Sequence, residues 1–188
     1  MKFNKYSHLT GLHATLSPSG SSWLRYSPEK VKSVWLNNIR KQEGTELHQL
    51  ASDMIKKGVR AAKLKNAFNM FVNDAIGFDM ESEVLLYYSD NCFGTADAIQ
   101  YYEQDKLLRV HDLKTGAHKV TFEQLFVYCA LFCLEYKHDP FNMQFECRIY
   151  QGNGYEVFTP DPYDISEIMH KISELDHALT EVISDYYK

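Results

Sequence analysis

Apolar residues in the first part of the chain recur every three or four positions. Over residues 45–55 and again over residues 64–76, this spacing is typical of helices that bury one face. Thr45 stands where it can cap the first of these helices, and Gly77 stands where it can end the second. Nearer the N-terminus, a serine-rich loop leads into a shorter helix around Trp23.

After Gly77 the pattern changes to an alternation with a period of two, which is typical of strands. The expected strands cover residues 83–89, 95–102, 107–114, 143–150 and 155–159. A helix over 122–136, capped by Thr121, separates the third strand from the fourth, and a long helix over 161–188 follows the last strand. This order predicts an α/β fold in which helices flank a mixed central β-sheet.

The chain has enough apolar residues to form one substantial core. It has 188 residues, 45% of them apolar and 14% aromatic, so we expect a single domain. We expect an N-terminal helical extension over 1–43, a core over 44–160 and a C-terminal helix over 161–188. No run approaches the roughly 18 apolar residues of a membrane helix, and the first residues are polar. We therefore predict a cytoplasmic, intracellular protein with no membrane partner.

The cysteines are few and scattered, at Cys92, Cys129, Cys133 and Cys147. This pattern predicts reduced thiols rather than a disulfide framework or a zinc site. Cys129 and Cys133 lie in an apolar run, so we expect them to act as small buried hydrophobes.

The formal net charge of −5 argues against a protein that coats nucleic acid through bulk electrostatics. It does not argue against a nuclease, because metal-binding carboxylates add negative charge while a local basic cluster can contact phosphates. The candidate basic residues are Lys56, Lys57, Arg60, Lys63 and Lys65, with a looser group at Lys30, Lys32, Arg40 and Lys41. Taken alone, each group also fits an ordinary solvated surface.

A polar break at residues 103–106 predicts a hairpin between the second and third strands that brings Asp97 opposite Asp112. Two opposed carboxylates repel each other, and a divalent cation would offset that repulsion. The period of two also places Asp112 and Lys114 on one face of the third strand. Two carboxylates beside a lysine suit metal-assisted phosphodiester hydrolysis with Mg²⁺ or Mn²⁺. The alternative is a set of ordinary surface charges in which Lys114 neutralises Asp112.

Four segments in this order resemble motifs of the PD-(D/E)XK nucleases, in particular the RecB-like branch that includes lambda-type exonucleases. Residues 94–97 (GTAD) resemble the G-x-x-D motif, and residues 112–116 (DLKTG) resemble the D-x-K-T-G motif. Residues 124–128 (QLFVY) resemble the Q-x-x-x-Y motif, and residues 44–48 (GTELH) an upstream helical motif with a metal-binding histidine. The resemblance implies a restriction-endonuclease-like core.

The resemblance also implies a role for each matching residue. Asp97, Asp112 and the carbonyl of Leu113 would bind one or two Mg²⁺ or Mn²⁺ ions, and Lys114 would be the catalytic lysine. His48 would complete the metal shell or bind a second ion. Glu83 is a weaker metal ligand that fits an acidic position of some members.

Gln124 and Tyr128 are four residues apart on one helix face, and the resemblance implies that they face the substrate or brace the site. Each also has a local explanation: Gln124 could form a capping box with Thr121, and Tyr128 could belong to the core. His48 could likewise be a packed or capping histidine. His111 alternates to the opposite face from Asp112 and is left out of the site.

The resemblance therefore implies a Mg²⁺- or Mn²⁺-dependent deoxyribonuclease, an exonuclease of recombination, repair or phage type. The alternatives are an endonuclease, a binding or regulatory module that has lost turnover, and RNA as the substrate. The cysteine spacing does not match the iron–sulfur cluster of some relatives, so no cluster is expected. The expected partners are DNA and a recombination or phage protein, while strand polarity and oligomeric state stay open.

Overall fold

The structure is a computed structural model that describes residues 16, 18–116 and 121–186. Contacts along the chain group it into two compact units, Met1–Glu43 and Gly44–Lys188. The helices are α1 (Pro28–Lys56), α2 (Ala67–Gly77), α3 (Glu123–Tyr136) and α4 (Pro162–Tyr186), with short 3-10 helices at Pro18–Arg25 and Pro140–Asn142. The strands are β1 (Glu81–Ser89), β2 (Cys92–Tyr102), β3 (Leu107–Lys114), β4 (Gln144–Gln151) and β5 (Gly154–Phe158).

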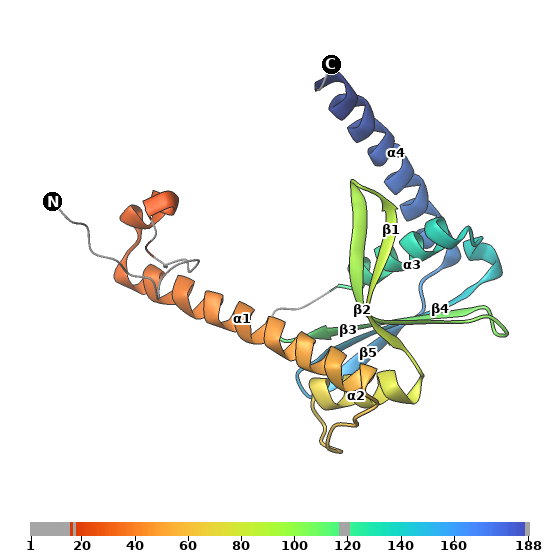
Figure 1. Ribbon diagram of the computed structural model, residues 1–188, viewed down its shortest axis with the longest axis horizontal. Helices are drawn as coiled ribbons and strands as arrows, with labels where there is room; N and C mark the ends of the chain where they lie inside the picture. The colour runs from red at the N-terminus through yellow and green to blue at the C-terminus, as the bar shows by residue number, and fades with distance from the viewer. Residues whose placement is uncertain (1–15, 17, 117–120, 187–188) are drawn as a thin grey trace. The chain divides into compact units, whose positions relative to one another are not determined.

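The five strands form one sheet in the order β1-β2-β3-β4-β5. β3 and β4 are parallel and are joined through α3, whereas the other neighbouring pairs are antiparallel. The sheet is therefore mixed, and the prediction of an α/β fold with a mixed central sheet is confirmed (Figure 1). The predicted register of the β2–β3 hairpin is also confirmed. The paired residues run from Tyr102 opposite Leu107 to Ala98 opposite His111.

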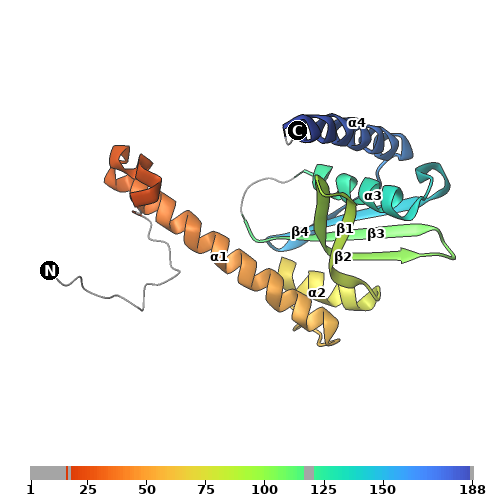
Figure 2. The ribbon, with the colours of Figure 1, turned by 45° about the horizontal axis from the view of Figure 1, so that its top comes forward.

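Helices cover both faces of the sheet in the unit Gly44–Lys188 (Figure 2). The larger apolar core lies between the sheet and α3 and α4, and it contains Cys129, Cys133 and Cys147. A second core on the other face joins α2 and the last turns of α1 to Ala98, Leu113 and Tyr150. Alternation along β3 supplies both cores, since Leu108 and Val110 enter the first and Leu113 enters the second.

The predicted start of the first helix at Thr45 is wrong. α1 begins at Pro28, where Ser27 Oγ accepts a hydrogen bond from the Lys30 N–H at 3.2 Å. Residues 29–43 are rich in glutamate, lysine, glutamine and arginine, which favour helix, so the helix runs through Thr45 without a break. The second helix starts at Ala67 rather than at residue 64, because the side chain of Asn66 caps it through the Asn69 N–H at 2.8 Å. It ends at Gly77, as predicted.

The prediction that Thr121 caps the helix after β3 is also wrong. α3 begins at Glu123, its N-cap residue is Phe122, and no side chain caps it. The Thr121 hydroxyl instead donates to the Glu123 carboxylate at 3.2 Å. The stripe predicted on α4 packs on the core only in its first half: Ile165 is fully buried, whereas Val182 is 67% exposed. Among the described residues, no helix combines the length and apolar character needed to cross a bilayer.

Candidate metal centre

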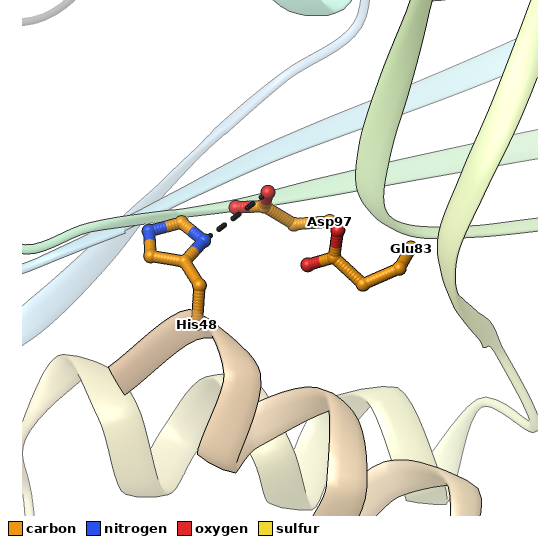
Figure 3. Close-up of side chains that lie close together, drawn as sticks. All are labelled: His48, Glu83 and Asp97. Atoms are coloured by element: carbon orange, nitrogen blue, oxygen red, sulfur yellow. Dashed lines mark ion pairs between the residues drawn. The ribbon is translucent and has the colours of Figure 1, made fainter. Parts of the chain in front are cut away.

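Three potential metal ligands converge beside the sheet. His48 from α1, Glu83 from β1 and Asp97 from β2 each offer a ligand atom, and these atoms lie within 4.8 Å of one another (Figure 3). His48 Nδ1 is 3.3 Å from Asp97 Oδ1. The structure thus brings together three of the residues that the sequence proposed as ligands, from elements far apart in the chain.

A bend in the β1–β2 hairpin sets the position of Glu83. The ladder pairs Ser82 with Ala98 and Val84 with Ala96, but it omits Glu83, whose φ of 55° lies in the left-handed region. The hairpin turns away from the direction of β3 near this point (Figure 1). A left-handed non-glycine residue costs about 1–3 kcal/mol and persists only where its surroundings hold it. At this position it brings the Glu83 carboxylate next to Asp97.

Asp97 is fixed by β3. It is one position beyond the last ladder pair, so that Asp97 and Asp112 are the next residues in the same register. In place of a further ladder bond, Asp97 Oδ2 accepts a hydrogen bond from the Leu113 N–H at 2.8 Å. Leu113 therefore contacts the centre through its N–H, and its carbonyl as a metal ligand stays a prediction.

Asp112 and Lys114 form the second half of the centre. Lys114 Nζ lies 3.1 Å from Asp112 Oδ1 and 3.0 Å from Oδ2, and it donates to Gln124 Oε1 at 2.7 Å. The Gln124 amide donates to the Tyr128 hydroxyl at 3.3 Å, and that hydroxyl donates to the Thr95 carbonyl at 2.6 Å. Gln124 binds the lysine and Tyr128, so the capping-box explanation for Gln124 is wrong.

The surroundings of the centre disfavour the charged form of two of its carboxyls, Asp112 and Glu83. Asp112 is 3% exposed. Burial first, and then the charge of Asp97, raise the pKa of the Asp112 carboxyl, although Lys114 lowers it. Burial and Asp97 likewise raise the pKa of Glu83, and the adjacent Asp97 carboxylate raises the pKa of His48. Burial is the main cause at both carboxyls, and the positive groups nearby, Lys114 at Asp112 and Lys56 at Glu83, do not offset it.

The donor set fits a hard divalent cation. Carboxylate oxygens with one imidazole nitrogen suit Mg²⁺ or Mn²⁺. Asp112 Oδ2 is buried and makes no hydrogen bond, and its ion-pair partner is Lys114 Nζ at 3.0 Å. A bound cation would give this oxygen a further partner. Asp112 lies outside the close group of His48, Glu83 and Asp97, which leaves room for one ion or two.

Part of the basic cluster predicted at residues 56–65 lies near this centre. Lys56 is close enough to Glu83 for its charge to oppose the rise in the pKa of that carboxyl. Arg60 instead donates to the carbonyl of Asn73 at 3.2 Å and so holds the loop before α2. Within this cluster, Arg60 therefore has a structural contact, whereas the charge of Lys56 acts on the candidate ligand Glu83.

A second polar cluster lies on the other face of the sheet, where His111 was expected. Glu146 accepts from Arg109 Nε at 3.0 Å and from Arg148 Nε at 2.8 Å, and Arg148 also pairs with Asp74 at 3.3 Å. Tyr150 donates to Asp74 at 2.8 Å. His111 Nε2 lies 3.9 Å from Glu146 Oε1. The proximity of His111 and of the arginines lowers the pKa of Glu146 to about 2, and burial lowers the pKa of His111.

Comparison with models of known protein families, with curated proteins and with solved structures gave no match to this chain.

Proposed function

We propose that this chain is a Mg²⁺- or Mn²⁺-dependent deoxyribonuclease of the PD-(D/E)XK type, built on a restriction-endonuclease-like core. One observation carries the proposal: the residues of all four motifs meet at one place. His48 contacts Asp97, Asp97 contacts the strand of Asp112 and Lys114, and Lys114 contacts Gln124. A helix, two strands and a second helix thus each contribute polar side chains to the same place.

The proposed roles follow from these contacts. Asp97, Asp112 and His48 would hold the ion, with Glu83 beside them. When bound, Mg²⁺ or Mn²⁺ supplies polarisation of the phosphate and a bound water with a lowered pKa. Lys114 would stabilise the negative charge that develops on phosphorus, or orient the attacking water.

Two further residues hold the lysine in place. Gln124 accepts from the ammonium of Lys114, and Tyr128 ties Gln124 to the backbone of β2. This chain restricts the lysine to a small volume next to Asp112, which is what a group acting in a transition state requires. Gln124 and Tyr128 therefore act in the proposal as positioning residues, whether or not they also touch DNA.

Cleavage of linear and covalently closed circular double-stranded DNA tests the proposal. Wild type, Lys114→Ala and Lys171→Ala would be compared in Mn²⁺, in Mg²⁺ and in EDTA. Lys171 is the matched control, because it is an exposed lysine paired with Glu174 on α4. Cleavage that needs both metal and Lys114, but not Lys171, is the expected result. Degradation of the linear form alone would identify an exonuclease, and cutting of the circle an endonuclease.

Absence of cleavage on double-stranded DNA would move the test to single-stranded DNA and then to RNA. Binding of DNA without cleavage of any substrate would overturn the enzymatic proposal in favour of a binding module on the same fold. The same assays with a candidate recombination or phage partner would test the proposed association with such a protein.

A further inference from the structure

Gly44 lies in the interior of α1 and is buried. Glycine is unfavourable inside a helix because it loses the most backbone freedom on folding. A Cβ atom at this position would lie 2.7 Å from Thr115 Oγ1 and 3.8 Å from Thr115 Cβ. Ordinary van der Waals contacts of a Cβ begin at 3.4 Å. The missing side chain therefore allows a close approach between α1 and the residue that follows Lys114.

Thr115 cannot easily turn out of the way. Its Cβ carries two heavy atoms, so two of its three staggered χ1 rotamers keep a heavy atom at the position that Oγ1 now occupies. A side chain at position 44 would have to move the threonine, the end of β3 or the helix. The close approach is thus a property of the pair Gly44 and Thr115.

The contact between Gly44 and Thr115 is linked to the metal centre through both α1 and β3. His48 follows Gly44 by four residues, about one helical turn or 6 Å along α1. His48 contacts Asp97 at 3.3 Å, and Asp97 accepts from the Leu113 N–H at 2.8 Å. Leu113 is two residues before Thr115, and Thr115 is the residue that packs on Gly44. The distance between α1 and the end of β3 at Gly44 and Thr115 therefore affects the position of the His48 imidazole next to Asp97.

We infer that Gly44 and Thr115 are positioning residues, whose close packing sets the distance of His48 from the carboxylates of β2 and β3. The inference rests on the proposed metal site for its effect on metal binding, whereas the placement of His48 follows from the packing alone. While a heavy atom of Thr115 stays at this place, extending the contact from 2.7 Å to at least 3.4 Å requires Thr115 and position 44 to move apart by about 0.7 Å. Metal ligands tolerate only about 0.2 Å around their ideal distances.

The test compares Gly44→Ala with two double variants that differ at Thr115. Gly44→Ala/Thr115→Ala removes the atom that the new Cβ meets, whereas Gly44→Ala/Thr115→Val keeps a heavy atom there. Gly77→Ala is the matched control, because its Cβ would meet no atom within 4 Å. For each full-length protein, NMR of the metal-free form gives the ¹⁵N chemical shift of His48 Nδ1, and calorimetry gives the affinity for Mn²⁺.

We expect Gly44→Ala to move the His48 Nδ1 signal and to weaken Mn²⁺ binding about 10- to 100-fold, the range for residues that orient metal ligands. Thr115→Ala should restore both measurements and Thr115→Val neither, and Gly77→Ala should match wild type. If Gly44→Ala does not fold, folding of the Thr115→Ala double variant supports the inference, and failure of both overturns it.

An unchanged His48 signal in Gly44→Ala, or a loss that Thr115→Ala does not rescue, would overturn the inference. A wild-type protein that binds no Mn²⁺ would instead overturn the proposed function. The His48 signal would still decide the positioning role in that case, so the two failures are distinguishable.

Discussion

Two groups of charged side chains lie on opposite faces of β3, and they differ in how their charges are balanced. On the α2 face, Glu146 and Asp74 are paired with Arg109 and Arg148. The pKa of Glu146 is lowered to about 2 in this group. Both carboxylates have a cationic partner from the protein, and these pairs link α2 to β3 and β4.

On the opposite side, Asp112 pairs with the ammonium of Lys114, and Asp97 contacts the imidazole of His48 beside Glu83. The pKa values of Glu83 and Asp112 are raised. At Asp112 burial is the main cause of the raised pKa and Lys114 does not offset it, which marks this carboxyl as a candidate ligand. The opposite pKa directions of Glu146 and Asp112 agree with the assignment of Asp112, and not Glu146, as a candidate ligand.

The largest expected effect separates Lys114 from the ligands beside it. Lys114→Ala should lower the cleavage rate at least 10²- to 10³-fold, the range for loss of one group that stabilises developing charge. It should keep Mn²⁺ binding, because the carboxylates remain. Asp112→Ala should lose both. Cleavage rates and Mn²⁺ calorimetry measure the two effects, and unchanged Mn²⁺ affinity in Asp112→Ala would show that Asp112 is no ligand.

Glu146→Gln should break the balanced group. Removal of the charge leaves Arg109 and Arg148 without their shared partner and should lower the free energy of unfolding by ~3 kcal/mol at pH 7. The stabilisation by Glu146 exists above its ordinary pKa of 4.5 and is lost as the pH falls through about 2. The difference between variant and wild type should therefore shrink over that range in urea unfolding. Mn²⁺ affinity should stay unchanged, and a parallel loss of metal binding would show that the two groups are coupled.

Mn²⁺ should stabilise the fold only when the candidate metal centre is intact. At a concentration of about 100 times its dissociation constant, the ion should stabilise wild type by about 2.7 kcal/mol, because it binds only the folded state. Asp97→Asn should abolish this gain while Glu146→Gln keeps it. Thermal unfolding with and without Mn²⁺ measures the difference. Equal stabilisation of wild type and Asp97→Asn would place the ion elsewhere.

The smallest effect tests whether Gln124 belongs to the site or to its helix. Thr121→Ala should change the free energy of unfolding by less than about 0.5 kcal/mol, because Thr121 caps nothing. Gln124→Ala should slow cleavage, since Lys114 loses its second partner. A stability loss of about 1 kcal/mol in Thr121→Ala, the usual cost of losing a cap, would restore the capping explanation.

Local patterns predicted most of the sheet. Alternation along the strands and the polar break at 103–106 were sufficient for the register of β2 and β3, because a slip of one residue would turn every side chain to the wrong face. The same alternation put Asp112 with Lys114 and sent His111 to the other side. These features depend on a few neighbouring residues, so they can be derived from the sequence.

Local patterns did not predict where the helices start or which distant residues meet at the site. Thr45 and Thr121 are good capping residues by type, but Ser27 and Asn66 provide the side-chain caps of α1 and α2, and capping depends on backbone geometry. The approach of His48 to Asp97 joins residues 49 positions apart, and only motif resemblance predicted it. A glycine within a run of helix-forming residues was the one available signal of the close approach at position 44.

Because the backbone at Glu83 is left-handed, the amino acids favoured at this position should differ between selection for folding and selection for cleavage. Glycine or asparagine would fit a φ of 55° with less strain and would also remove a carboxylate from a crowded group. A library selected only for folding should therefore become enriched in glycine and asparagine at this position. The same library selected for cleavage should return glutamate, and the divergence between the two outcomes would measure how much stability the chain gives up to keep an acid at that bend.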